Sequence, residues 1–172
     1  MTFADWLHGW RVVLDPARRA RLAAWRALAG ADTGRPAGED GFVVVDVEAT
    51  GLDLWSDRLI AIGAVRLDRL RIPLARSFYR VLRQARPSTH DNILFHGIGG
   101  TAQVEGTEPA DALLDFLAYA GRSVLVGFHT PFDHVMLRKA LRRHLGLGFA
   151  PLWLDLAALA PALEGVRARA PA

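Results

Sequence analysis

The chain has 172 residues, 51% of them hydrophobic, and a formal net charge of +3 at pH 7. Because it has no cysteine, disulfide frameworks, thiolate nucleophiles and cysteine-based zinc sites are excluded. No apolar stretch approaches the 18 residues of a membrane-spanning helix and the N-terminus lacks the order of a signal peptide, so we expect a cytoplasmic protein without membrane contact.

The first 40 residues are predicted to be a helical extension and linker, separate from a main domain over 41–172. Asp15 followed by Pro16 is typical of a helix start, and Gly30 ends the pattern. Between them lies a helix rich in Ala and Arg. The glycine- and proline-containing stretch that follows it is interpreted as the linker.

Tryptophans mark both halves of this N-terminal region. Trp6 and Trp10 are expected in a short helix of their own, and Trp25 lies in the helix that begins at Pro16. These side chains either contact nucleic acid or a partner, or they pack onto the main domain. We favour packing, because large aromatic side chains are usually buried.

The most informative stretch runs over 42–52 and reads Phe-Val-Val-Val-Asp-Val-Glu-Ala-Thr-Gly-Leu. Its β-branched residues predict a strand buried on both faces. Asp46 and Glu48 are two residues apart, so both carboxylates lie on one face of that strand. Because adjacent carboxylates repel each other, Mg²⁺ or Mn²⁺ would compensate them. The alternative is a strand that ends at Val45 and leaves both acids in solvent.

The remaining elements predict an α/β domain with a mixed sheet. Short breaks between the first three strands indicate an antiparallel meander, and the later strands are expected to run parallel to the first, with flanking helices. The polar segment 84–106 is expected to be irregular. The other expected elements are strands at 58–67, 72–82, 123–128 and 152–154, and helices at 109–121, 131–145 and 155–163.

Asp133 is the third residue of the helix expected after Thr130. One interpretation is that its charge only offsets the helix dipole. The other is that it is a third metal ligand, since sites in such sheets gather beyond the carboxyl ends of the strands. Two cations held by three carboxylates would activate a water and clamp a phosphodiester. The basic side chains on this helix, including Lys139 and Arg143, are interpreted as a solvated face, with weak phosphate contact as the alternative.

Three motifs resemble those of the DnaQ-like (DEDDh-type) 3′–5′ exonucleases, the family of the proofreading epsilon subunit of bacterial DNA polymerase III. Residues 46–52 resemble the first motif, Asp-x-Glu-Thr-Thr-Gly-Leu, and residues 126–134 resemble the second. The triplet 96–98, His-Gly-Ile, resembles a family landmark between them. The resemblance spans 42–163 in the family's order. It implies an RNase H-like fold and hydrolysis from a 3′ end with two Mg²⁺ or Mn²⁺ ions.

The resemblance also implies roles for individual residues. Asp46, Glu48 and Asp133 would be the catalytic metal ligands. Gly51 would give the backbone freedom that lets the chain approach the substrate closely. The implied partners are single-stranded DNA or RNA 3′ ends and, as a further candidate, a DNA polymerase subunit. The residues that would line the terminal-nucleotide pocket are Ala49, Thr50, Gly51, Leu52, His129 and Phe132.

The sequence departs from the family pattern at three places. Ala49 replaces the usual Thr, and Phe128-His129 stands where His-Asn is common. The third motif, a His or Tyr about five residues before a final Asp, is not found, so we expect a truncated exonuclease domain. Asp155 is interpreted as a helix cap rather than a ligand. The candidates after Asp133 that lack the motif spacing are His134, His144, Asp155 and Glu164.

We therefore expect a two-metal 3′–5′ exonuclease, with DNA and a proofreading-like role favoured over RNA trimming. A catalytically impaired module of the same fold that binds nucleic-acid ends or a polymerase is the alternative. A generic α/β domain without a metal site is the third reading.

Overall fold

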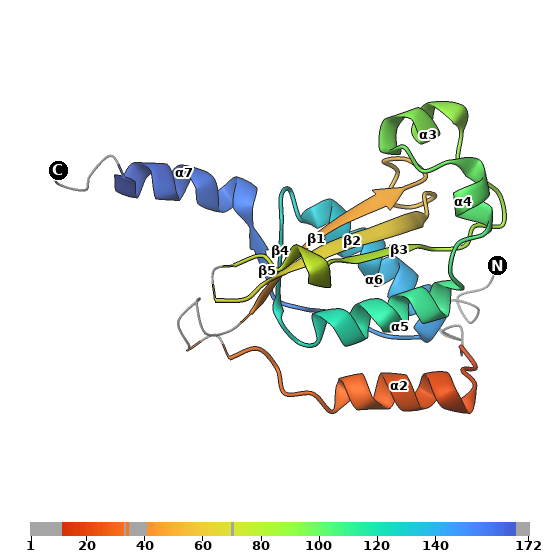
Figure 1. Ribbon diagram of the computed structural model, residues 1–172, viewed down its shortest axis with the longest axis horizontal. Helices are drawn as coiled ribbons and strands as arrows, with labels where there is room; N and C mark the ends of the chain where they lie inside the picture. Colours follow the sequence, from red (N-terminus) through yellow and green to blue (C-terminus); the bar gives the residue numbers. More distant parts are fainter. Residues whose placement is uncertain (1–11, 33, 35–40, 70, 168–172) are drawn as a thin grey trace, which may run out of the picture.

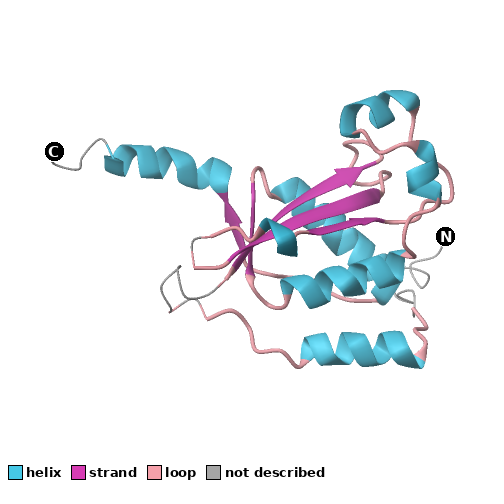
Figure 2. Ribbon diagram, in the orientation of Figure 1, coloured by secondary structure: helices cyan, strands magenta, loops and turns pink. Residues whose placement is uncertain are grey.

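A computed structural model describes residues 12–32, 34, 41–69 and 71–167, with side chains up to residue 161. The short helix expected around Trp6 and most of the expected linker lie outside these residues. The described part forms one five-stranded sheet with helices around it (Figures 1 and 2). Its elements are α2 Pro16–Arg26, β1 Phe42–Ala49, β2 Leu59–Leu67, η1 Leu74–Arg76, β3 Phe78–Val81, α3 His90–His96, α4 Gly100–Val104, α5 Pro109–Ala120, β4 Val124–Gly127, α6 Pro131–Leu145, β5 Trp153–Asp155 and α7 Leu156–Arg167.

The sheet has the strand order β3-β2-β1-β4-β5. The first three strands are antiparallel neighbours, and β4 and β5 run parallel to β1. This arrangement confirms the mixed sheet predicted from the short breaks between the early strands. β1 is the central strand, and its pairing with β4 covers only Phe42 to Val44.

The main core lies on one face of the sheet, where α5 and α6 pack, and a smaller cluster contains Ile60, Ala61 and Ile98. Val43, Val45, Val47 and Ala49 alternate along β1, and each is at most 7% exposed. The residues between them lie on the opposite face, and Asp46 there is exposed to solvent. The expectation that β1 is buried on both faces is therefore wrong at this position. The described helices α5 and α6 both pack on the valine face, which leaves the acidic face accessible.

Helix α2 lies along α5 and is joined to it by buried and charged side chains (Figure 1). Trp25 is 7% exposed, and its indole N–H donates to the Gly121 carbonyl at 2.7 Å. Arg18 pairs with Asp111 at 2.7 Å, and this contact holds the pKa of that carboxyl below its ordinary value. The helix is thus packed on the main body, as favoured for its tryptophan. The domain boundary at residue 40 stays a prediction.

The region between the second strand and α5 differs from the expectation. Instead of one strand over 72–82, the chain makes the short turn η1 and then β3. The expected irregular segment 84–106 contains the helices α3 and α4. Thr89 caps α3 by accepting the N–H of Asn92, and Gly97 ends it with φ of 72°. Both signals are local capping residues that periodicity alone does not reveal, because the helices are too short.

Among the described residues, no helix combines the length and the apolar character needed to cross a membrane.

Removing the Trp25 side chain is expected to separate α2 from the body. Trp25→Ala removes a buried ring and leaves the Gly121 carbonyl without its donor, so we expect a loss of about 3–5 kcal/mol in the free energy of unfolding. Urea unfolding of the full chain measures it. Leu28→Ala, at a side chain that is 47% exposed just beyond α2, is the matched control and should change stability by less than about 0.5 kcal/mol. Equal effects of the two substitutions would contradict the packing described for Trp25.

Candidate active site

Both strand acids lie within β1, because the strand continues to Ala49. The alternative in which the strand ends at Val45 is therefore wrong. Asp46 stands opposite Gly63 of β2, and Glu48 stands opposite Ala61. Asp46 is exposed and Glu48 is half-buried. The two carboxylates thus lie on one accessible face of the central strand, beside residues with little or no side chain.

Asp133 reaches the same strand from the first turn of α6. Its side chain is buried, with 5% of the residue exposed, and one carboxylate oxygen accepts the Val47 N–H at 3.1 Å. Since β4 pairs with β1 only as far as Val44, the amide of Val47 takes this side-chain acceptor in place of a strand partner. The bond places Asp133 at the backbone between Asp46 and Glu48.

Among the described residues, no ion pair offsets the charges of these acids. Burial, followed by the charge of Asp46, raises the pKa of Asp133 from 3.8 to about 6. The same two causes, in the same order, raise the pKa of Glu48. In the part of the chain that the structure describes, no ion pair involves any of the three. Burial combined with like charges is typical of sites that bind cations or move protons.

The donor atoms suit a divalent metal ion in their chemistry. Mg²⁺ and Mn²⁺ prefer oxygen ligands, and a cation would relieve the repulsion between Asp46 and its two neighbours. Across the described residues, however, no group of three or more His, Asp or Glu side chains is already arranged to hold a metal ion. The three carboxylates therefore fit a metal site in ligand type and charge, although their described positions do not form a ready-made one.

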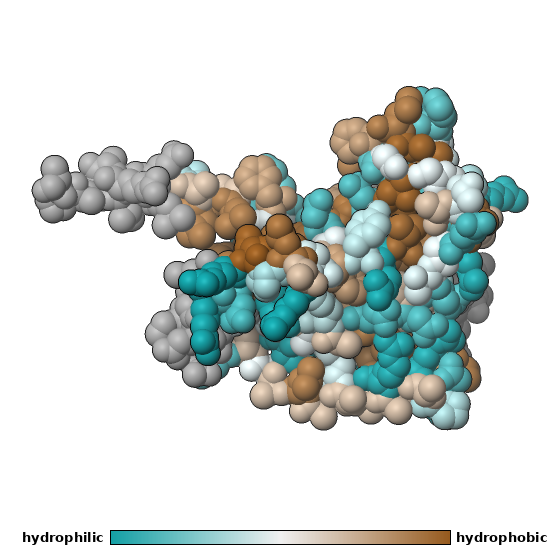
Figure 3. Space-filling model, viewed as in Figure 1, coloured by the Kyte–Doolittle hydropathy of each residue, from teal (hydrophilic) through white to brown (hydrophobic). Residues whose placement is uncertain are grey.

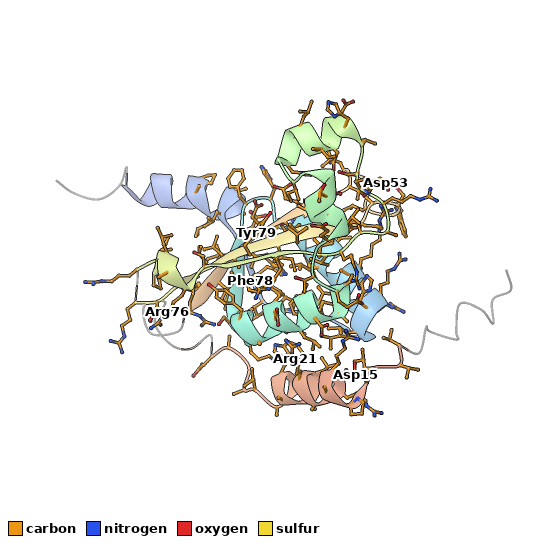
Figure 4. The ribbon with its side chains drawn as sticks, turned by 45° about the vertical axis from the view of Figure 1, so that its right-hand side comes forward. Asp15, Arg21, Asp53, Arg76, Phe78 and Tyr79 are labelled. Carbon is orange, nitrogen blue, oxygen red and sulfur yellow. The ribbon has the colours of Figure 1, made fainter. Side chains whose placement is uncertain are left out.

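Tyr79, which Figure 4 labels, lies in register with Asp46 across the sheet. It pairs with Gly63 of β2, which in turn pairs with Asp46 of β1, so the three residues follow one another across the sheet. Burial, together with the charge of Glu48, raises the pKa of the Tyr79 phenol. This shift further favours the protonated hydroxyl, which can donate a hydrogen bond on this face. Sequence reasoning missed Tyr79, since only strand pairing brings it to this face.

The residues expected to line a substrate pocket do so in different ways. Ala49 turns its side chain into the core, and its carbonyl accepts the Asn92 amide at 3.2 Å. The Thr50 hydroxyl donates to Asp57 at 2.6 Å, so it is used within its own loop. A Cβ on Gly51 would lie 2.5 Å from an Asp57 oxygen. Gly51 therefore leaves room for that carboxylate, which differs from the expected backbone freedom.

The apolar and aromatic members of the expected pocket are divided between the surface and the core. Leu52 is 82% exposed. Phe128 is also exposed, and its ring meets His129 edge-on at 4.6 Å between centroids. His129 has φ of 58° and is exposed. Phe132 packs against the core. The exposed members are thus free to contact a ligand, and Phe132 contributes mainly to packing.

Asp155 is confirmed as a capping residue. It accepts the N–H of Ala157 at 2.9 Å in the first turn of α7. It also accepts the backbone N–H groups of His129 and Thr130, at 3.0 and 3.2 Å, and these bonds lower its pKa despite the opposing effect of burial. Its oxygens are thus occupied by the turn between β4 and α6.

A chain of hydrogen bonds from α3 supports the end of β1. The Ile98 N–H donates to His96 Nδ1 at 2.9 Å, which assigns the ring proton to Nε2, and Nε2 donates to Asn92 Oδ1 at 2.8 Å. The Asn92 amide then donates to the Ala49 carbonyl. Leu94 and Phe95 on the same helix are exposed and form the apolar surface over α3 (Figure 3). The four-residue spacing of Asn92 and His96 was the available sequence signal for this contact.

Comparison with known proteins places this chain among exonucleases. A family model described as exonuclease, of the RNase T type, matches residues 43–159. DNA polymerase III of the PolC type from Thermotoga maritima is 28% identical over 130 residues, and its Thermotoga petrophila counterpart is 29% identical over 126 residues. These matches cover 76% and 73% of this chain, which spans 9% of the length of either polymerase.

Solved structures give the same fold. Exonuclease I from E. coli in complex with a dA16 oligonucleotide has a TM-score of 0.65 and 17% identity, over 76% of this chain and 31% of that chain. A complex titled ExoI/SSB-Ct has a TM-score of 0.65 and 18% identity, over 78% and 32%. At these identities the likeness concerns the fold alone, and it confirms the RNase H-like fold.

Neutralising Asp133 is expected to stabilise the metal-free protein. Because the folded pKa of about 6 exceeds the ordinary 3.8, the stability linked to this group is complete below pH 3.8 and is lost as the pH rises through 6. Asp133→Asn keeps an acceptor for Val47 without the charge. In EDTA at pH 7.5 it should raise the free energy of unfolding by about 1–3 kcal/mol, measured in urea, with no gain at pH 3.5.

The matched control for this prediction is Asp155→Asn. Hydrogen bonds lower the pKa of Asp155, so the same substitution there should destabilise the protein at pH 7.5. An Asp133→Asn protein that is less stable than the wild type in EDTA would contradict the electrostatic description of the site.

Acidification is expected to loosen α3 from β1. Burial lowers the pKa of His96 below 6.5, so its contribution to stability is present above pH 6.5 and is lost as the pH falls from there through the folded pKa. Protonated Nδ1 can no longer accept the Ile98 N–H. The stability difference between wild type and His96→Asn should therefore shrink between pH 7.5 and 5.5 in thermal unfolding. His90→Gln, on the exposed start of the same helix, is the control, and a difference that is constant with pH would be evidence against the described tautomer.

Proposed function

Since the chain belongs to the RNase T exonuclease family, we propose that it removes nucleotides from the 3′ ends of DNA by a mechanism that uses two divalent cations. The observation that carries the proposal is the buried carboxylate of Asp133, bonded to the strand between Asp46 and Glu48 without a cationic partner among the described residues. DNA is the favoured substrate because the relatives include PolC-type DNA polymerases and a solved structural neighbour binds an oligodeoxynucleotide.

In this proposal Asp46, Glu48 and Asp133 hold Mg²⁺ or Mn²⁺. Bound at these carboxylates, the cations would activate a water and stabilise the charge that develops on the leaving oxygen. Leu52 and His129 are exposed near the ends of β1 and β4 and would contact the terminal nucleotide, together with the backbone of Ala49, Thr50 and Gly51. Phe132 supports this surface from the core side.

A second candidate is a catalytically impaired module that binds nucleic-acid ends or a polymerase partner. This candidate is favoured because the histidines described after Asp133 contact other parts of the protein. His134 packs on Trp153 with 5.9 Å between ring centroids, and His144 lines a hollow beside Arg143. Without a positioned general base a chain hydrolyses more slowly by about 10²–10⁴-fold. A polymerase partner is proposed on separate grounds, since the matching stretch of the relatives lies within DNA polymerase III.

Degradation of labelled oligonucleotides tests the proposal. With Mn²⁺ and a 5′-labelled single-stranded DNA oligomer, we expect stepwise shortening from the 3′ end, reduced at least about 100-fold by Asp46→Asn. An RNA oligomer run in parallel ranks the two substrates. Asp91→Asn, which changes an exposed acid on α3, is the matched control and should leave the rate unchanged. Folded protein that binds the oligomer without shortening it would favour the binding module instead.

A further inference from the structure

The loop between β1 and β2 is held in one shape by its own side chains. Asp57 accepts the Thr50 hydroxyl at 2.6 Å and the Asp53 N–H at 2.8 Å. Asp53, which Figure 4 labels, accepts the Trp55 N–H at 2.8 Å and the Ser56 hydroxyl at 2.7 Å. These bonds cross-link both halves of the loop directly after the acidic strand.

Lys139 fastens this loop to α6. Its ammonium donates to the carbonyls of Leu54, Trp55 and Asp57, at 3.0, 2.6 and 2.6 Å. An ammonium has three protons, and all three are used here. The interpretation of Lys139 as part of a solvated face is therefore wrong. The loop is thus held in two ways, by the internal bonds of Asp53 and Asp57 and by the contact of Lys139 with its carbonyls.

The fixed loop presents a tryptophan to solvent. Trp55 is 92% exposed, although Trp side chains are highly buried on average. Because its backbone is bonded at both N–H and carbonyl, the exposure of the ring does not come from a loose backbone at this position. An exposed indole on a fixed backbone, in the loop that follows the acidic strand, is suited to stacking on a planar group.

A basic hollow of about 220 Å³ adjoins the anchored loop. Asp57 and Lys139 form part of its wall. Arg83 is paired with Glu108, whereas among the described residues the Arg58 guanidinium bonds only through its Nε, on Gln84 at 3.2 Å. Within the described residues, Arg143 makes no ion pair. The cationic side chains of the lining, Arg58, Arg83, Lys139 and Arg143, outnumber Asp57 and the neighbouring Glu108.

The hollow lies within a few nucleotides' length of the three acids. Lys139 and Arg143 follow Asp133 on α6 by six and ten residues. At a rise of 1.5 Å per residue, they are roughly 9 and 15 Å along the helix from the proposed metal ligand. At about 3.4 Å per stacked nucleotide, a strand would cover this distance with roughly three to five nucleotides.

We propose that Trp55 and the basic hollow form a second binding site for single-stranded nucleic acid, upstream of the terminal nucleotide. A base would stack on Trp55, and a backbone phosphate would bind Arg58 and Arg143. The inference rests on the proposed function for the position of the 3′ end, but binding at this site requires no hydrolysis.

The test compares oligothymidylates of two and twelve nucleotides, both in EDTA so that no cleavage occurs. Trp55→Ala should weaken binding of the longer oligomer by about 5- to 100-fold, and Trp55→Phe should retain most of the affinity. Arg143→Glu should weaken this binding as well. It should also reduce the slope of log K against log salt concentration by roughly 0.7 for each lost phosphate contact. The shorter oligomer should bind all variants equally. A twelve-nucleotide oligouridylate, measured in parallel, separates a DNA preference from general single-strand binding.

The matched controls are Arg19→Glu and Leu28→Ala. Arg19→Glu makes the same charge change at an exposed position of α2, and both variants should bind like the wild type. Equal affinity of wild type and variants for the longer oligomer, or equal losses for both lengths, would overturn the proposal. So would tighter binding of an oligoglutamate, which would assign the hollow to acidic proteins. A chain that shows the length-dependent loss but no cleavage with Mn²⁺ keeps this site and loses the proposed activity.

Discussion

The hydrogen bond from the Val47 N–H to the Asp133 carboxylate connects the sheet to its candidate site. β4 pairs with β1 only as far as Val44, so the amide of Val47 requires another acceptor, and the first turn of α6 supplies it. The same bond buries an anion beside two others. What satisfies the backbone of the central strand therefore also creates the electrostatic repulsion that a cation would relieve. The position of Asp133 and the proposed chemistry thus depend on one contact.

Much of the fold follows from sequence periodicity and capping. β1, α5 and α6 were predicted within a few residues, because each has a long apolar pattern with a clear start and end. The elements between β2 and α5 were not predicted correctly. They are too short for a pattern to emerge, and their ends are set by single capping residues such as Thr89 and Gly97. The strand expected over 72–82 is instead the turn η1 followed by β3, and both elements are too short for a pattern to separate them.

The candidate site was only partly accessible to sequence reasoning. Spacing alone placed Asp46 and Glu48 on one strand face, and motif position added Asp133. The directions of neighbouring side chains were not accessible, since they depend on contacts between distant parts of the chain. Ala49 turns to the core, Thr50 turns to Asp57, and the support of β1 by His96 and Asn92 arises from a helix that was not expected.

The contact of Lys139 with the loop between β1 and β2 has a chemical consequence, because the chain contains no other lysine. Lys139 is the single lysine of the chain, since every other basic side chain is an arginine. Its amine is half-buried and holds three carbonyls of the loop that carries Trp55. Reagents that acylate or methylate amines would thus meet one side-chain target in the whole chain, and acylation there would remove the charge and two of the three protons that hold the loop. A single covalent label could report on the conformation of this loop without any engineered residue.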